Sequence, residues 1–224
     1  MKKLIIVVIL TIAAQKSFGQ IPFEVMVGNK QTMYFGYIQK DLDSTGKWNI
    51  FSQGIFAVNY RDSSYNNISI DNQLTYQLNN WIGISAGGSF DGKKFIPSLG
   101  LSLSYINKKG DFFVTAFPTV QFDKPKTLDL FALINYSPQF NNKWGLFSQL
   151  IIGSNYGVQK EYPEQSRGVL GLFTHHNISN QLLRVGINYK QKFQVGVGAD
   201  FAQFGIVSVP KFDNYGIFLR YQIE

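Results

Sequence analysis

The chain has 224 residues, of which 45% are hydrophobic, 16% aromatic and 16% charged, and its formal net charge is +7. Soluble domains carry about 25% charged residues, so this composition is unlike theirs, and 20 Phe with 12 Tyr are typical of a β-rich chain. The absence of cysteine excludes a disulfide framework, a thiolate metal site and a lipid-modified cysteine.

Residues 1–19 are expected to be a secretory signal peptide. Two lysines near the start precede an apolar run from Leu4 to Ala14, and small residues up to Gly19 precede a cut at Gln20. The alternative is an uncleaved anchor, but a run of eleven residues is short of the about 20 needed to span a bilayer. Cleavage removes three lysines and lowers the charge from +7 to +4. Much of the basic character therefore belongs to the leader, and no nucleic-acid partner is expected.

Residues 20–224 are expected to form one domain, built from stretches of about ten residues in which apolar and polar positions alternate before a polar turn. In 94–106, for example, Leu99 and Leu101 fall on one face of a strand, and Ser98 and Ser102 on the other. Comparable runs occupy 47–60, 68–78, 81–90, 111–122, 127–136, 144–156, 167–177, 182–202 and 214–223.

Alternation alone also fits a soluble antiparallel sheet, such as a β-sandwich or a lipocalin-like barrel. Two features favour a membrane barrel instead. Many runs reach the length that a tilted membrane strand needs, about 9–11 residues, whereas soluble strands average about 5–6. The second face is small and polar, as in a barrel interior. The sequence therefore predicts an all-β fold, a closed antiparallel transmembrane β-barrel.

Each of the three tryptophans follows a short polar turn: Trp48 follows 43–47, Trp81 follows 79–80 and Trp144 follows 141–143. Three tyrosines precede turns of the same set. Because these turns alternate with a second set, all six aromatic residues should lie at one end of the barrel, where tryptophan and tyrosine favour the membrane–water interface. The predicted girdle consists of Trp48, Trp81, Trp144, Tyr76, Tyr105 and Tyr136. Three core tryptophans are the alternative.

The strand count depends on two segments. Residues 22–42 form one strand or two that turn at 28–30, and residues 182–202 form one strand or two that turn at 190–192. Bacterial single-chain barrels have even strand numbers. Splitting only the first segment gives about twelve strands with both termini at the tryptophan end, which we prefer, and splitting only the second gives twelve with both termini at the opposite end. Ten and fourteen stay open. The loops 61–66, 91–94, 123–126 and 154–166 then lie at the other end. A barrel of this size should have a narrow or occluded lumen.

The inward-facing positions carry five ionisable residues: Asp71, Asp129, Arg184, Asp200 and Arg220. One hypothesis is a polar pore lining or a salt-bridged constriction that sets ion preference. The other, which we prefer for so small a barrel, is a structural network that fills the lumen.

His175 and His176 are the only histidines, and Ser179 is near. A lipid hydrolase would need a histidine that activates a serine, but adjacent strand residues point to opposite faces and no Gly-x-Ser-x-Gly motif is present. We expect the pair beside a turn at 177–181, with no catalytic residue, metal site or cofactor.

The signal peptide, the alternating strands, the Asn-Asn-Trp and Asn-Lys-Trp patterns and the last strand from Tyr215 to Tyr221 together resemble the small porin-like outer-membrane β-barrel proteins. The resemblance implies a barrel in the outer membrane, in contact with lipid, and no particular substrate. The expected role is non-enzymatic passage of small solutes or maintenance of the envelope. The alternatives are a barrel lipid hydrolase and an interaction protein that uses loop 154–166.

Overall fold

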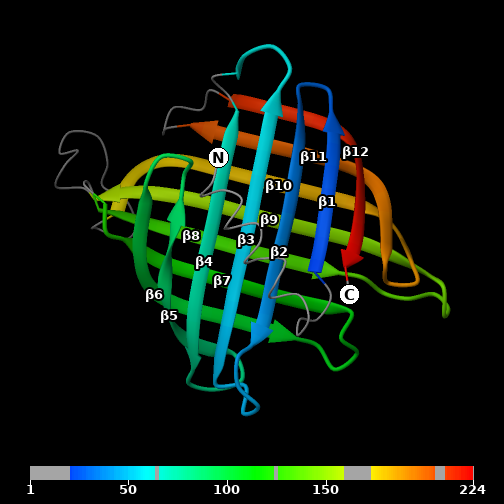
Figure 1. The fold of residues 1–224 in the computed structure, drawn as a ribbon, viewed down its shortest axis with the longest axis horizontal. Coiled ribbons are helices and arrows are strands. Elements are labelled where there is room, and N and C mark those ends of the chain that lie inside the picture. Colours follow the sequence, from blue (N-terminus) through cyan, green and yellow to red (C-terminus); the bar gives the residue numbers. More distant parts are fainter. Residues whose placement is uncertain (1–20, 64–65, 124–125, 159–172, 205–209, 224) are drawn as a thin grey trace, which may run out of the picture.

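The structure, a computed structural model, describes residues 21–63, 66–123, 126–158, 173–204 and 210–223. Within these ranges the chain forms twelve strands (Figure 1), so the predicted all-β fold and its strand number are confirmed. The strands are β1 (Ile21–Gly28), β2 (Gln31–Asp41), β3 (Trp48–Asn59), β4 (Asn67–Gln77), β5 (Ile82–Phe90), β6 (Phe95–Ile106), β7 (Phe112–Gln121), β8 (Thr127–Tyr136), β9 (Trp144–Val158), β10 (Phe173–Tyr189), β11 (Phe193–Phe204) and β12 (Pro210–Ile223). The proposed signal peptide lies outside the described residues. No helix in the described ranges is long and apolar enough to cross a bilayer.

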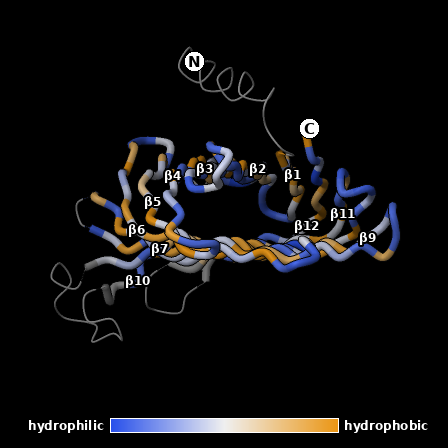
Figure 2. The backbone as a smooth tube through the Cα atoms, turned by 90° about the horizontal axis from the view of Figure 1, so that it is seen from below, coloured by the Kyte–Doolittle hydropathy of each residue, from blue (hydrophilic) through white to orange (hydrophobic). Residues whose placement is uncertain are grey.

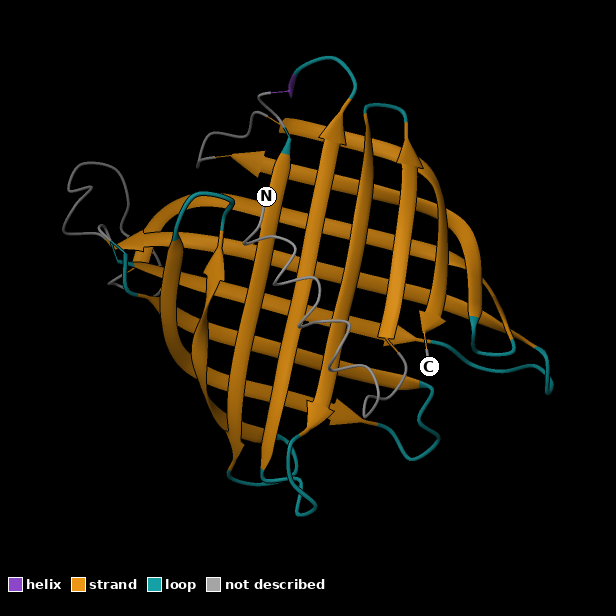
Figure 3. Cartoon of the chain, viewed as in Figure 1, coloured by secondary structure: helices purple, strands orange, loops and turns teal. Residues whose placement is uncertain are grey.

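The sheet closes on itself. Every strand pairs antiparallel with its neighbours in the chain, and β1 pairs with β12 in a register that places Ile21 opposite Ile223. The strands β2 to β4 of the near wall cross the strands β7 to β10 of the far wall at a steep angle, as strongly tilted barrel strands do (Figures 1 and 3). Closure leaves no unpaired sheet edge.

The alternation in the sequence becomes a two-sided wall, because successive side chains of a strand point to opposite faces. Polar and apolar residues follow one another along the strands in the edge-on view (Figure 2). The outward-facing side chains are large, apolar and exposed. They include Val27, Leu74, Ile84, Leu99, Leu101, Leu183, Val185, Ile187, Val195, Val197, Ile217 and Leu219. The inward-facing side chains mix polar groups with a buried apolar core.

The strand assignment near the C-terminus differs from the prediction. Residues 177–181, expected to form a turn, lie inside β10, which also takes up the end of the predicted run 167–177. The predicted single strand 182–202 turns at 190–192, so that β10 ends and β11 begins there. The two errors compensate, and the total of twelve is right although both ambiguous segments are split.

The turn after β10 explains this error. Tyr189 O accepts a hydrogen bond from Lys192 N at 3.1 Å, and the two central residues, Lys190 and Gln191, have φ of 53° and 58°. Such a two-residue hairpin turn usually contains Asn or Gly, because both central residues need positive φ. A Lys-Gln pair carries no such signal in the sequence.

The twelve strands have two ends. The turns at 42–47, 78–81, 107–111, 137–143 and 190–192 define one end, here called the tryptophan end, where β1 begins and β12 ends. The turns at 29–30 and 91–94, the end of β3 and the end of β7 define the far end. Both strand termini thus lie at the tryptophan end, as expected. The expected loop 154–166 begins later, because β9 runs to Val158; residues 159–172 lie outside the described residues.

Candidate functional site

The five predicted lumen residues all point inward, each from a different strand: β4, β8, β10, β11 and β12. Asp71 on β4 and Asp129 on β8 are half-buried. Arg184 on β10, Asp200 on β11 and Arg220 on β12 are 1%, 3% and 1% exposed. The structure brings the last three together and leaves the first two apart from them.

The buried three form an ion network with Glu24 of β1. Arg184 donates through Nε to Glu24 Oε1 and through Nη1 to Asp200 Oδ1, each at 2.6 Å. Arg220 Nη2 donates to Glu24 Oε2 at 2.6 Å and also to Gln149 of β9. Two carboxylates and two guanidinium groups balance in charge, as buried ions require.

Glu24 is the residue that the sequence prediction missed. It is 1% exposed and lies between the outward-facing Phe23 and Val25 on the first strand. An acidic residue between two apolar ones, in phase with the alternation of the strand, is the signal that would have placed it inside the barrel.

Neighbouring residues shape the space for the arginines. The guanidinium carbon of Arg220 lies 4.6 Å from the centroid of the Phe147 ring, within range of a cation–π interaction. A Cβ at Gly198 would lie 2.9 Å from Arg184 Cδ and 2.8 Å from Met26 Sδ. Glycine at position 198 therefore leaves the room that the arginine side chain occupies.

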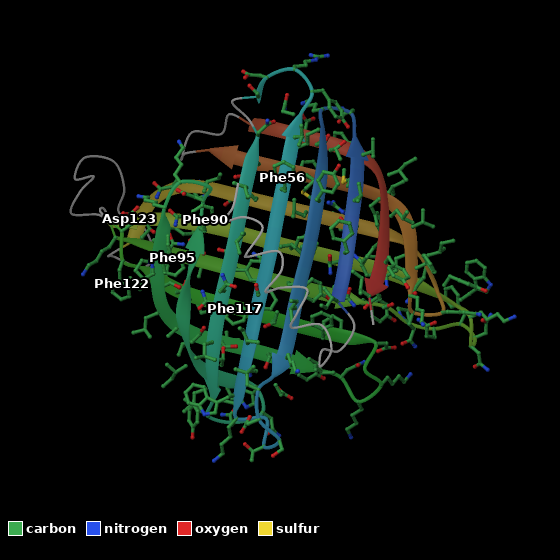
Figure 4. The ribbon with its side chains drawn as sticks, in the orientation of Figure 1. Phe56, Phe90, Phe95, Phe117, Phe122 and Asp123 are labelled. Atoms are coloured by element: carbon green, nitrogen blue, oxygen red, sulfur yellow. The ribbon has the colours of Figure 1, made fainter. Side chains whose placement is uncertain are left out.

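Apolar side chains from opposite walls meet in the middle of the lumen. Phe51 of β3 lies 5.0 Å from Phe117 of β7 and 5.4 Å from Phe131 of β8, measured between ring centroids, and Figure 4 shows Phe117 toward the middle of the barrel. Phe35 of β2 and Leu133 of β8 belong to one buried cluster. Together with the ion network, these side chains form a layer across the lumen, here called the mid-lumen layer.

Two cavities flank this layer. The far vestibule, of about 340 Å³, has Phe51, Phe117 and Phe131 at its inner limit and reaches Asp91 in the turn at the far end. The tryptophan-end vestibule, of about 390 Å³, reaches from Phe147 and Arg220 to the turn at 107–111. The two cavities share no lining residue. The mid-lumen layer therefore separates the two mouths of the barrel.

Asp71 and Asp129 line the far vestibule. Asp71 Oδ2 accepts hydrogen bonds from Gln53 Nε2 at 2.9 Å and Ser69 Oγ at 3.3 Å. Asp129 Oδ1 accepts one from Asn155 Nδ2 at 3.4 Å. Neither forms an ion pair with a described residue, in contrast to Glu24 and Asp200.

The six predicted girdle residues all lie on the outer face at the tryptophan end. Their exposed fractions run from 36% for Tyr76 to 60% for Trp81. Aromatic rings of neighbouring strands touch along this end. The pairs, with the distances between ring centroids, are Trp48–Tyr76 at 5.0 Å, Tyr105–Phe112 at 6.3 Å, Phe112–Tyr136 at 6.4 Å, Trp144–Tyr189 at 4.7 Å and Phe193–Tyr221 at 4.8 Å. The rings thus form a band around β3 to β12.

In the turn before each tryptophan, an Asp or Asn side chain accepts a hydrogen bond from the backbone N–H of that tryptophan. Trp48 N donates to Asp43 Oδ1 at 2.9 Å. Trp81 N donates to Asn79 Oδ1 at 3.0 Å, and Trp144 N donates to Asn141 Oδ1 at 2.9 Å. Asp and Asn side chains stabilise turns in this way. The hydroxyl of Thr45 and the N–H of Trp48, as donors to its carboxylate, lower the pKa of Asp43 below its ordinary value.

Exposed aromatic residues also gather at the far end. Phe90 of β5 pairs in register with Phe95 of β6, and Figure 4 shows both near Phe122 and Asp123 at one edge of the barrel. Phe95 and Phe122 are 58% and 49% exposed, and Asp123 forms an ion pair with Lys94.

His176 lies beside serines inside β10, not beside a turn. Its Nε2 is 2.6 Å from Ser179 Oγ, which is 2.8 Å from Ser154 Oγ of β9. A shift of register between His176 and Ile178 makes a bulge that brings His176 and Ser179 together. The side chain of His175 lies outside the described residues. No group of three or more histidine or acidic residues in the described ranges fits a metal ion.

Comparison with known proteins finds the same architecture in solved structures. A NanC porin matches with a TM-score of 0.52 at 7% identity, over 92% of this chain and 99% of the other. The chain has the fold of a small porin, as the resemblance in its sequence implied. A KdgM porin, also solved with disordered oligogalacturonate, matches with a TM-score of 0.45 at 14% identity, over 92% and 99% of the two chains. At these identities the likeness concerns the fold alone. No protein-family model and no curated protein matches.

Proposed function

We propose that this chain is an exported outer-membrane barrel of the porin-like kind, which passes small solutes through a narrow lumen. The observation that carries the proposal is the arrangement of the interior, in which a vestibule at each mouth, lined in part by polar side chains, leads to one mid-lumen layer. A barrel with a purely structural role in the envelope would need no cavity at either mouth.

The outer face supports the membrane location. Its band of exposed Leu, Ile and Val side chains lies between the aromatic band at the tryptophan end and the exposed phenylalanines at the far end. Membrane barrels show an apolar band between two aromatic girdles. In plain water this surface would be a large exposed apolar patch of the kind that causes association.

The mid-lumen layer would act as the constriction of this path. Phe51 and Phe131 reach into the lumen from opposite walls, and their loss would leave the backbone ladders of β3 and β8 intact. The ion network beside them joins β1 to β10, β11 and β12, and so holds the shape of the wall. The aromatic half of the layer is therefore the part that sets the width.

Single-channel conductance in planar bilayers tests the proposal. The unaltered barrel should show a small conductance, and the Phe51→Ala/Phe131→Ala double variant a several-fold larger one. An outward-facing change such as Phe56→Ala provides the matched control and should have no effect. If neither folded barrel conducts, the transport proposal fails and a structural role in the envelope replaces it.

The contact between His176 and Ser179 favours one second candidate, hydrolysis of a lipid ester. Ser179 Oγ would attack the ester carbonyl while His176 Nε2 takes its proton, the alcohol would leave with that proton, and water would release the acyl group. Both side chains lie on the outer face, where lipid would reach them. Hydrolysis of lipid esters is compared in three barrels. Hydrolysis by the unaltered barrel and by Ser154→Ala, with none by Ser179→Ala, would support this candidate. No turnover by the unaltered barrel would eliminate it.

A further inference from the structure

The far vestibule has the size and the walls of a binding site for a small molecule. Its volume of about 340 Å³ lies in the range of ligand pockets, about 300–1,000 Å³. Aromatic rings of Phe51, Phe117 and Phe131 limit it on the inner side, and its walls carry amide and hydroxyl side chains together with isoleucine and leucine side chains. A ligand there would have an apolar part against the rings and a polar part against the walls.

The charged side chains among the described residues that line the far vestibule are all acidic. Asp71 and Asp129 point into it, Asp91 lies at its rim, and no lysine or arginine is among its described lining residues. Asp91 is exposed and accepts from the backbone N–H groups of Lys93 and Lys94. Asp71 and Asp129, farther inside, receive hydrogen bonds only from neutral side chains. The two inner carboxylates therefore leave a negative potential that a solute cation would neutralise.

An unused acceptor beside the carboxylates points to the same kind of ligand. Gln53 is 5% exposed and donates through Nε2 to Asp71, while its Oε1 has no hydrogen-bond partner among the described residues. A buried acceptor without a donor costs free energy. A ligand with N–H donors would supply that hydrogen bond as well as the positive charge.

We infer that the far vestibule binds small organic ammonium ions. The carboxylates of Asp71 and Asp129 neutralise the ammonium group, Gln53 Oε1 accepts one of its N–H donors, and the apolar part of the ion packs on the phenylalanine rings, whose faces attract cations. The inference goes beyond the proposed function, because a solute can bind in the vestibule whether or not it passes the mid-lumen layer.

Three probe molecules of similar size and different charge separate the effect of charge on binding from the effect of size. They are tert-butylammonium, the neutral tert-butanol and the anionic pivalate, titrated into the purified barrel in detergent micelles and measured by calorimetry. We expect tert-butylammonium to bind in the millimolar range and the other two at least about tenfold more weakly, since one charge-assisted hydrogen bond differs from a neutral one by about that factor. Equal binding of tert-butanol or pivalate would overturn the inference, as would no binding of tert-butylammonium.

Matched variants then locate the site. Asp71→Asn/Asp129→Asn should weaken tert-butylammonium binding about tenfold or more. The control Asp111→Asn removes one carboxylate from the tryptophan-end vestibule and should leave tert-butylammonium binding unchanged. Heat-modifiable migration in gels shows that each variant is folded. If the double variant does not fold, Asp129→Asn alone serves, because Asp129 has a single hydrogen bond with the described residues, of 3.4 Å. Equal weakening by Asp111→Asn, or none by Asp129→Asn, would contradict the site.

Discussion

Two pairs of carboxylates face the lumen of this barrel and have opposite surroundings. Glu24 and Asp200 each accept from an arginine and are almost completely buried. Asp71 and Asp129 accept only from neutral side chains and line a cavity. Position on the inner face alone therefore does not define the role of an acidic residue. The paired carboxylates hold strands together, and the unpaired ones remain available to a solute.

The largest expected effect comes from breaking the paired set. Glu24→Gln leaves Asp200 as the one carboxylate of the network, paired with Arg184, and removes the carboxylate partner of Arg220, so that buried positive charge is no longer balanced. Removal of one partner from a buried ion pair costs about 3–5 kcal/mol of unfolding free energy. Urea titration of the barrel in lipid vesicles measures this loss.

Asp71→Asn is the matched control for that variant. It removes the same charge from the same face, and the new side chain still accepts from Gln53, so we expect the unfolding free energy to stay equal or rise. Equal losses in the two variants would show that the distinction between the pairs is wrong.

A smaller effect, on ion preference, should follow from neutralising the unpaired set. In a salt gradient across a planar bilayer, the reversal potential of the unaltered barrel should indicate preference for cations. Asp71→Asn/Asp129→Asn should shift the reversal potential toward zero with little change in stability. If the potential of the unaltered barrel indicates anion preference, the far vestibule does not control entry.

The comparison also shows what the sequence could predict. Alternation placed Asp71, Asp129, Arg184, Asp200 and Arg220 on the inner face, because the period of a strand determines the face. The alternation could not predict which of these residues form ion pairs. Glu24 and Arg184 are 160 residues apart in the chain, and only the closure of β1 onto β12 brings them within 2.6 Å.

The residue types that usually indicate turns gave the wrong prediction at two places, within β10 and at the turn that follows it. The polar stretch around Asn177 looks like a turn but forms a bulge, where Asn177 donates to Asn155 and Ser179 contacts Ser154 across the strand pair. The real turn has Lys190 and Gln191 at positive φ, a conformation that these residue types do not indicate. Pairing of β10 with β9 overrides the local preference at the bulge, and pairing of β10 with β11 overrides it at the turn.

The smallest expected effect concerns the turns at the tryptophan end. Asp43 holds Trp48 through a carboxylate whose lowered pKa comes from the donors Thr45 and Trp48, whereas neutral asparagines hold the other two tryptophans. A lowered pKa means that the stabilisation is present above the ordinary value and is lost as the pH falls through the lowered one. The backbone amide signal of Trp48 should therefore shift as the pH falls below about 4. NMR in micelles checks this, and an equal shift at Trp81 or Trp144 would contradict it.

Contact between the outer face and lipid is the central requirement of a membrane barrel, and the depth of the three tryptophans tests this contact directly. In vesicles, lipids brominated near the headgroup should quench the fluorescence of Trp48, Trp81 and Trp144 strongly, lipids brominated near the chain ends should quench it weakly, and aqueous acrylamide should have little effect. A purified chain that stays folded and monomeric in buffer without amphiphile, with all three tryptophans quenched freely by acrylamide, would contradict the account.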